Sequence, residues 1–261
     1  MNLKHVTGGE AWAAPSKRSR IKTMAADADL AFDVVSLKLS NSERRGKGLG
    51  TRGTEYYAFN YTLTDMIVWA YNLNRHQIVG AAGWVDSEKY DLLAKPGGEG
   101  RPSQQQWKIM FQKMMADRFK LKFHREKKEL TVYAIVAGKG APKIIKSQED
   151  PNGPISLVFH GPGDLPARNV TMAQFAGILQ SSVLDRPVVD QSGISGRYDF
   201  HLVWTPDESQ LRPTEGVPPD DPEAPPNLFA AMQEQLGLRL ISTKADVDLL
   251  VIDHAEKASE N

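Results

Sequence analysis

The sequence predicts an α+β fold made of two related α-β-β-α-β-β halves, with mainly antiparallel sheet and helices packed on one face. Three observations support this prediction. Apolar residues recur at helical spacing in four segments, a helix-capping pattern precedes three of them, and short strings of the first half return 108 to 117 positions later in the second. Leading strands are expected at 32–39 and 56–60, where β-branched and aromatic residues gather.

Four helices are predicted from apolar residues at positions i, i+3, i+4 and i+7, which lie on one face of a helix. They are expected at 63–71, 107–115, 172–179 and 228–236. Three of them follow a capping box, in which a Ser or Thr oxygen accepts a backbone N–H and the side chain three residues on accepts one in return. The three pairs are Thr62 with Asp65, Ser103 with Gln106, and Thr171 with Gln174.

The halves are related by strings that recur in the same order. The recurring strings are Asn60-Tyr-Thr-Leu with Asn169-Val-Thr-Met, and Tyr90-Asp91 with Tyr198-Asp199. In each half, a predicted helix follows each of these strings. A strand–turn–strand segment then follows, at 121–135 in the first half and at 238–252 in the second. Each such segment predicts a hairpin with a five-residue turn. We interpret the recurrence as an internal duplication, against the alternative that two αββ stretches resemble each other by chance.

The domain organisation follows from the recurrence and from two segments of biased composition. Residues 1–30 are polar, carry a basic cluster and lack the apolar run of a signal peptide, which predicts a disordered leader. The first α+β repeat is expected at 31–147 and the second at 148–261. The second repeat contains a Pro-rich acidic loop at 207–226, whose prolines cannot donate strand hydrogen bonds, so this loop is expected on the surface.

The composition excludes several classes of protein. The 261 residues carry 32 Lys and Arg against 32 Asp and Glu, so the broad positive surface of a nucleic-acid binder is missing. The sequence has no cysteine, which excludes thiolate zinc sites, iron–sulfur clusters and a cysteine nucleophile. No apolar run approaches the ~20 residues of a membrane span. With nucleic acid excluded, the expected partner is an unidentified ligand or protein. The sequence does not indicate an oligomeric state.

Motifs for catalysis or cofactor binding are weak. Gly48, Gly50 and Gly53 match the spacing of a dinucleotide fingerprint, but the run neither follows a strand nor opens a helix, so it is interpreted as a flexible hairpin loop. The six histidines form no H-E-x-x-H motif. We therefore assign no catalytic residues, no metal ligands and no cofactor, and expect a protein that is not an enzyme.

Six residues are candidates for a binding site: Trp84, Tyr90, Asp91, Arg197, Tyr198 and Asp199. Trp84 follows two glycines in a loop, where it is either a binding anchor or a lid over the helix layer. If a pseudo-twofold axis brings the Asp91 and Asp199 carboxylates together, they form a proton-sharing pair. Otherwise each Asp ends a turn or caps a neighbouring element, and each Tyr packs at the start of its strand.

Several strings together resemble a known family. They are Phe32-Asp-Val-Val-Ser-Leu-Lys, Thr62-Leu-Thr-Asp-Met-Ile-Val-Trp-Ala-Tyr71, Met115-Ala-Asp-Arg-Phe-Lys-Leu-Lys-Phe-His124, Pro187-Val-Val-Asp-Gln-Ser-Gly and Val251-Ile-Asp-His. On these strings, the chain resembles a soil-associated bacterial family of uncharacterised proteins, found alone or C-terminal to β-lactam-sensor-type membrane metallopeptidases. The resemblance covers about residues 31–261. It supplies no catalytic residues, and no metallopeptidase motif is present.

The resemblance also implies an extracytoplasmic setting, because members usually follow a signal peptide or a membrane anchor. The leader of this chain departs from that pattern, since it has no apolar segment.

Three functions follow as hypotheses, of which the last is a purely structural duplicate domain that orients a neighbouring chain. The first is a non-enzymatic binding or interaction module of the bacterial envelope, because the scaffold is duplicated and no catalytic constellation is present. The second is a hydrolase that uses Asp91 and Asp199 with a nearby histidine, such as His124 or His201. The second hypothesis requires the two carboxylates to share one cleft.

Overall fold

The structure, a computed structural model, describes residues 22–41, 43–151, 155–207 and 224–258. Its helices and strands confirm the predicted α+β class and include three four-stranded sheets. The first sheet has the order β1-β5-β3-β2 and consists of β1 (Phe32–Leu39), β2 (Gly48–Arg52), β3 (Glu55–Tyr61) and β5 (Tyr90–Pro96). The second has the order β7-β11-β9-β8 and consists of β7 (Ile145–Lys146), β8 (Ser156–Leu157), β9 (Asp164–Val170) and β11 (Tyr198–Val203). Both are antiparallel throughout.

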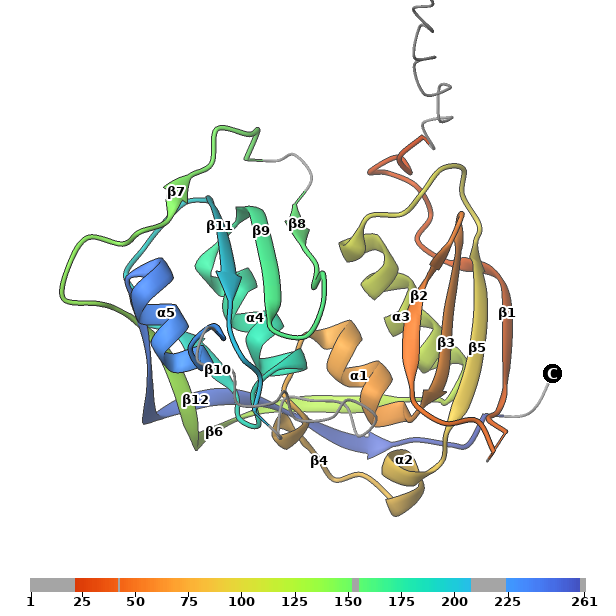
Figure 1. Cartoon of the computed structure of the whole chain (residues 1–261). Coiled ribbons are helices and arrows are strands. Elements are labelled where there is room, and N and C mark those ends of the chain that lie inside the picture. Colours follow the sequence, from red (N-terminus) through yellow and green to blue (C-terminus); the bar gives the residue numbers. More distant parts are fainter. Residues whose placement is uncertain (1–21, 42, 152–154, 208–223, 259–261) are drawn as a thin grey trace, which may run out of the picture.

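The third sheet connects the other two (Figure 1). It has the order β10-β6-β12-β4 and consists of β4 (Ile78–Val79), β6 (Lys122–Ala137), β10 (Val188–Asp190) and β12 (Leu238–His254). The helices are α1 (Leu63–Tyr71), α2 (Gly83–Ser87), α3 (Gln104–Arg118), α4 (Met172–Ser182) and α5 (Leu228–Leu236), with a 3-10 turn at Arg75–Gln77.

The sheets and helices form two lobes. The first lobe is the first sheet with α1, α2 and α3, and the second lobe is the second sheet with α4 and α5. The two long strands β6 and β12 pair with each other and run beneath both lobes in Figure 1, and this pair is called the ribbon below. Within the described ranges, no helix has the length and apolar character needed to cross a membrane.

The helices begin where the capping boxes predict. Thr62 Oγ1 accepts the Asp65 N–H and the Asp65 carboxylate accepts the Thr62 N–H, both at 3.1 Å. The same exchange of hydrogen bonds precedes α3 and α4. Each box satisfies two backbone donors that the first turn of a helix leaves without intrahelical partners. Local sequence therefore sets the start of these helices.

The two predicted hairpins are not formed. Residues 122–137 and 238–254 are unbroken strands, β6 and β12, which pair with each other antiparallel along their length. A tight turn favours residues that tolerate special backbone angles, yet the expected turns at 125–129 and 242–246 contain no glycine, asparagine or proline and no positive φ. Their exposed charged side chains suit a ribbon solvated on both faces, and Lys244 pairs with Glu129 across it at 3.3 Å.

Each end of the ribbon contributes to the lobe of the other half. Leu250 and Ile252, near the end of β12, lie in the core of the first lobe. Ile135, near the end of β6, lies in the core of the second lobe. The short strands also pair with the long strand of the other half. β4, from the first half, pairs parallel with residues 250–251, and β10, from the second half, pairs parallel with residues 133–135. Both cores therefore contain residues from both halves of the chain.

Order begins earlier than predicted, because residues 22–30 of the expected leader pack on the first lobe. Met24 is buried in the core of that lobe, and Ala28 packs against it. The Gln106 side chain donates to the Ala25 carbonyl at 2.8 Å. The prediction of a leader disordered up to residue 30 is wrong for this part, since its side chains and its backbone both have partners. The rest of the leader and residues 208–223 of the Pro-rich acidic loop lie outside the described residues.

Gly48 and Gly50 lie in a strand rather than in a flexible loop, whereas Gly53, with φ of 63°, lies in the hairpin turn between β2 and β3. Residues 48–52 form β2, the edge strand of the first sheet. A Cβ added to Gly48 would lie 2.6 Å from the Phe59 ring, and one added to Gly50 would lie 2.8 Å from the Tyr57 hydroxyl. The rings of β3 thus lie across β2, and their close approach accounts for both glycines.

Candidate functional site

The six candidate residues lie in two separate places. Tyr90 and Asp91 begin β5 in the first sheet, whereas Tyr198 and Asp199 begin β11 in the second sheet, on the other side of the molecule (Figure 1). The two carboxylates bind different neighbours and do not contact each other. The structure therefore does not form the carboxylate pair on which the hydrolase hypothesis depends.

Asp91 organises the entry to α1. Its carboxylate accepts the Ser40 hydroxyl at 2.6 Å and the Asn60 N–H at 3.0 Å, and it pairs with Arg44 at 3.3 Å. Burial alone would raise the pKa of Asp91, but these partners outweigh burial and hold the pKa below its usual range. Asn60 has a left-handed backbone with φ of 56°, and its side chain donates to the carbonyls of Arg44 and Gly46. Asp91 thus stabilises an uncommon backbone conformation between β3 and α1.

Asp199 has the corresponding place in the second lobe. It accepts the N–H of Asn169 at 2.8 Å, and Asn169 has the same left-handed φ of 56°. The Asn169 side chain donates to the Asp150 carbonyl at 2.8 Å, and Arg197 donates to the Asn169 carbonyl at 2.6 Å. These contacts hold the chain between β9 and α4, so Asp199 and Arg197 have structural partners of their own.

Tyr90 connects the end of the chain to the first lobe. Its ring is buried and its hydroxyl donates to Glu88 at 2.5 Å, while Glu88 also pairs with Lys257 beyond β12. The hydrogen bonds from Lys257 and Tyr90 lower the pKa of Glu88. Burial, followed by the hydrogen bond to Glu88, raises the pKa of Tyr90. Glu88 is therefore an ionised carboxylate that lies between the Lys257 ammonium and the neutral Tyr90 phenol.

Trp84 and Tyr198 lie in different lobes. Trp84 stacks on Phe119, with ring centroids 6.4 Å apart and ring planes at 16° to each other. This position on α2 is that of a lid over a buried ring, which is one of the two interpretations of Trp84. Tyr198 is half-buried and its hydroxyl donates to the Ser195 carbonyl at 3.2 Å.

Two of the histidines, His124 and His201, lie against acidic side chains. His124 lies 3.1 Å from Glu126 and 2.7 Å from Asp253 at one end of the ribbon, and these two carboxylates raise the pKa of His124. His201 lies 2.6 Å from Asp164 in the second sheet. Across the ranges that the structure describes, no group of three or more His, Asp or Glu could hold a metal ion.

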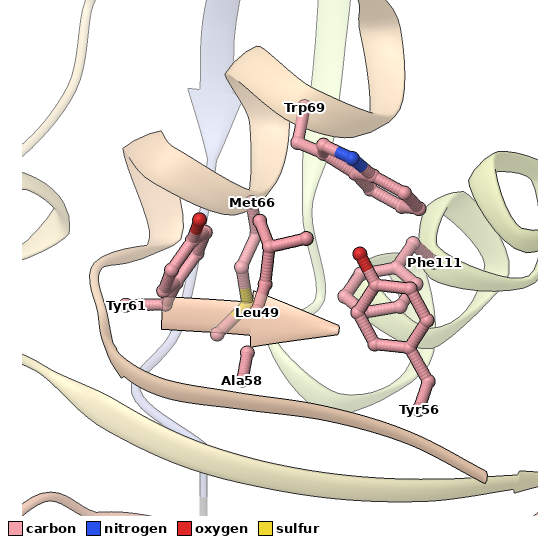
Figure 2. A pocket seen from close by; sticks show the side chains of 7 residues that line it. All are labelled: Leu49, Tyr56, Ala58, Tyr61, Met66, Trp69 and Phe111. Carbon is pink, nitrogen blue, oxygen red and sulfur yellow. The ribbon is translucent and has the colours of Figure 1, made fainter. Parts of the chain in front are cut away.

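An apolar hollow lies at the open edge of the first sheet, at a place that the sequence did not indicate. Leu49 of the edge strand β2 lies over it, and the other walls come from β3, α1 and α3 (Figure 2). It is a shallow depression open to solvent, and it encloses no room for a water molecule. The residues that line it are Leu49, Tyr56, Ala58, Tyr61, Met66, Trp69 and Phe111.

Aromatic rings form most of the walls of this hollow. The Tyr56 ring centroid lies 5.2 Å from that of Trp69 and 4.9 Å from that of Phe111, and the Trp69 and Phe111 centroids are 4.8 Å apart. All three pairs are tilted or edge-to-face, the arrangement that favours contacts between rings. The lining carries no charged side chain. Lys47, whose ammonium lies 5.4 Å from the Tyr61 ring centroid, is paired with Asp65 at 2.7 Å.

The Tyr56 hydroxyl is buried in these walls without a hydrogen bond. The residue is 3% exposed, and no group in the described part of the chain pairs with its oxygen. Figure 2 shows the hydroxyl directed from β3 toward the side of the hollow where Leu49 and Trp69 lie. Burial, reinforced by the neighbouring Tyr61 and Tyr57, raises the pKa of Tyr56 far above its ordinary value, so the group is a neutral donor. An unpaired buried polar group costs about 1–3 kcal/mol, so it calls for an explanation.

Sequence reasoning missed the hollow because its residues come from four elements that are adjacent only in the fold. One signal was available, however. Several positions that are aromatic in the first half are aliphatic in the second.

Comparison with known proteins identifies a family and no activity. Residues 64–255 match a family described as "Protein of unknown function (DUF3738)". The match covers most of the chain, from α1 to just past β12, and leaves out β1, β2 and β3, so the chain belongs to this family. No curated protein and no solved structure matched the chain.

Proposed function

We propose that the chain is a binding module and that the hollow of the first lobe is its ligand site. The observation that carries this proposal is the buried Tyr56 hydroxyl, which faces an aromatic hollow without a hydrogen-bond partner. Folding gives no reason to keep a buried donor unpaired, whereas a ligand that pairs with it does. Apolar walls with one polar group are the usual composition of small-molecule sites, in which the walls supply affinity and the polar group supplies orientation.

The size of the hollow limits what it accepts. The space between the lining side chains encloses no room for a water molecule, so it admits a small apolar group only if these side chains move apart. The ligand reaches it past Leu49, which is 36% exposed on an edge strand and therefore has room to change rotamer. The proposed site therefore depends on the movement of lining side chains, of which Leu49 is the one at the edge strand.

Titration with toluene tests the proposal. Toluene is expected to raise the thermal midpoint of the protein, because a ligand that binds the folded state stabilises it. In NMR spectra, the Trp69 indole signal should move the most among the tryptophans. Leu49→Phe, which puts a ring at the entrance, should weaken this response. Leu157→Phe, at the corresponding place in the second lobe, should leave the response unchanged. Toluene that moves no Trp69 signal at saturation would contradict the proposal.

A duplication is the proposed origin of the two lobes. The two outer sheets have strand orders that correspond element by element, and each lobe has a left-handed asparagine before its first capped helix. The ribbon pairs Glu129 with Asp246, which are separated by the same 117 positions that relate the two long strands. A family member with one half, forming a homodimer through the same ribbon, would support this origin. A half-length member with an unrelated strand order would contradict it.

The bacterial envelope is the proposed setting of the module. This setting is supported by the resemblance of residues 31–261 to bacterial proteins that follow a signal peptide or membrane anchor. Fractionation of cells that express the natural gene tests it, and the protein should be recovered with the envelope or periplasm. Recovery in the cytoplasm alone would contradict this setting without affecting the ligand site.

A further inference from the structure

We infer that a polar contact between the ends of α1 and α4 is a latch that holds the two lobes at a fixed angle, and that the ribbon is the hinge about which the lobes turn when this latch opens. The latch consists of Asn72 and Asn74, which follow α1, and of Gly177 and Gln180 on α4. Figure 1 shows α1 and α4 on the facing sides of the two lobes. The latch is independent of the proposed ligand site, because none of its residues lines the hollow.

Asn74 caps two elements that belong to different halves of the chain. Its side-chain oxygen accepts the His76 N–H at 3.0 Å, at the start of the 3-10 turn after α1. Its side-chain amide donates to the carbonyls of Gln180 at 2.9 Å and Leu184 at 3.2 Å, at the end of α4. The last carbonyls of a helix have no intrahelical partner, so Asn74 supplies one from the other half. Because Asn74 is 4% exposed, water can replace these bonds only if the lobes separate here.

Gln180 reaches back across the same contact. Its side-chain amide donates to the Asn72 carbonyl at 2.5 Å, and its side-chain oxygen accepts the Val188 N–H at 3.1 Å, where β10 begins. Since β10 pairs with β6, Gln180 links the end of α1, the helix α4 and the ribbon. Both ends of its amide group are occupied, which fixes the orientation of the side chain between the lobes.

The backbone of α4 is shaped to receive Asn72. Asn72 is the C-cap of α1 with a left-handed φ of 56°, and its side chain lies over Gly177. A Cβ added to Gly177 would lie 2.0 Å from Asn72 Nδ2, a distance that no packing allows. Glycine inside a helix is less favourable than alanine, so its presence in α4 needs a reason. The close approach of Asn72 is that reason.

The ribbon is suited to be the hinge. The two lobes have separate hydrophobic cores, and residues 124–129 of β6 are exposed and belong to neither core. Lobes that no large apolar interface joins are expected to move relative to each other, and two-stranded ribbons twist more than wide sheets. The contact at the latch is made of amide groups, so its hydrogen bonds decide whether the lobes move together.

Gly177→Ala tests the latch. Alanine ordinarily stabilises a helix relative to glycine, but here its methyl group should displace Asn72 and open the contact. Residual dipolar couplings of backbone amides, measured by NMR on the whole chain, report the relative orientation of the lobes. Couplings from both lobes of the wild type should fit one alignment tensor, and Gly177→Ala should need a separate tensor for each lobe. A wild type that needs two tensors, or a variant that still fits one, would overturn the inference.

A second substitution shows whether the effect passes through Asn72. Asn72→Gly removes the side chain that alanine would meet, keeps the carbonyl that Gln180 binds, and places glycine at a left-handed C-cap, which it favours. Asn72→Gly combined with Gly177→Ala should therefore fit one tensor again. A combined variant that still needs two tensors would overturn the inference.

Asn74→Ala opens the latch by a different route and keeps the test decisive if Gly177→Ala does not fold. It should need two tensors, because it removes the bonds to Gln180 and Leu184. The matched control is Asn227→Ala, which removes a cap inside the second lobe, where Asn227 accepts the Ala230 N–H at 3.1 Å. This control should fit one tensor. Equal behaviour of the two alanine variants would overturn the inference.

Discussion

The two lobes share a polar frame and differ in their interior. In each lobe, an asparagine with φ of 56° precedes a helix, and an aspartate at the start of the neighbouring strand accepts its N–H, at 3.0 Å for Asn60 and 2.8 Å for Asn169. Each lobe also receives the end of the other half's long strand. In both lobes these contacts support the chain before a helix, so they are accounted for without a ligand.

The interiors diverge at the hollow. Counted from Asn60 and Asn169, the positions of Tyr56, Tyr61 and Trp69 are taken by Leu165, Val170 and Ile178 in the second lobe. Leu157, which pairs with β9 as Leu49 pairs with β3, is buried where Leu49 is 36% exposed. At these three positions branched aliphatic side chains replace rings, although the second lobe has rings of its own at other positions, such as Phe175 and Phe200. The difference separates the contacts that both lobes share from a feature that only the first lobe has.

The largest expected effect concerns the exchange of strand ends between the lobes. Leu250→Ala should destabilise the first lobe, although Leu250 belongs to the second half of the chain, because its side chain is fully buried in that core. Such a truncation costs about 2–5 kcal/mol of unfolding free energy. Hydrogen exchange should lose protection first in α1 and α3.

Ile135→Ala is the matched variant, because Ile135 is fully buried in the second lobe. It should lose protection first in α4 and α5. If Leu250→Ala exposes α4 and α5 before α1, the two cores are not the energetic units that the packing indicates.

The next largest effect is a difference in stability between substitutions of Asp91 and of Asp199, the two aspartates of the frame. Asp91→Asn should cost about 1–3 kcal/mol, because an amide cannot accept from Ser40 and Asn60 and also pair with Arg44. Asp199→Asn should cost less, because the bond that Asp199 accepts comes from the Asn169 N–H. Urea unfolding at neutral pH measures both, and equal losses would mean that Ser40 and Arg44 contribute nothing.

Acid should remove the effect of Asp91. Its pKa in the folded protein is lowered, so the ionised carboxylate stabilises the protein above the unfolded pKa, and this contribution is lost as the pH falls through the folded pKa. The stability difference between wild type and Asp91→Asn should therefore shrink from about pH 7 to about pH 3. A difference that is constant over this range would show that charge has no part in it.

A smaller effect, of opposite sign, is expected at the hollow. Tyr56→Phe should raise the unfolding free energy of the ligand-free protein by about 1 kcal/mol, because it removes an unpaired buried hydroxyl. Tyr90→Phe is the matched control and should lower it, because the Tyr90 hydroxyl donates to Glu88. If Tyr56→Phe is destabilising, the hydroxyl already has a favourable contact, such as one with the face of the Trp69 ring.

The features predicted correctly from the sequence are those that local interactions determine. The capping boxes, the helices and the short strands depend on residues within a few positions of one another, and all three boxes form. The ribbon could not be predicted in this way. The segment 121–135 has the same local sequence whether it turns back on itself or pairs with residues 238–254, and the choice depends on a partner more than 100 positions away.

The candidate site was harder to predict for a related reason. A Tyr-Asp pair at the start of a strand is compatible with catalysis and with support of a neighbouring turn, and the partners Ser40 and Asn60 that distinguish the two are distant in sequence. The hollow depends on the packing of β2, β3, α1 and α3, which no spacing describes. The recurring strings could have indicated it, because residues that differ between two otherwise similar segments are candidates for a role in only one of them.

The smallest expected effect is at the end of the ribbon, where the halves also differ. His124 on β6 lies against Glu126 and Asp253, and the corresponding position on β12 is Ile241. The two carboxylates raise the pKa of His124, so its protonated form adds stability at low pH, and this contribution is lost as the pH rises through the folded pKa.

NMR titration should give His124 a pKa above the ordinary value of about 6.5, and Asp253→Asn should move the pKa back toward that value. Asp164→Asn beside His201 is the control, because it removes a carboxylate from another histidine and should leave the His124 titration unchanged. A His124 pKa that does not respond to Asp253→Asn would mean that the exposed pair is screened by solvent and adds nothing to the pairing of β6 with β12.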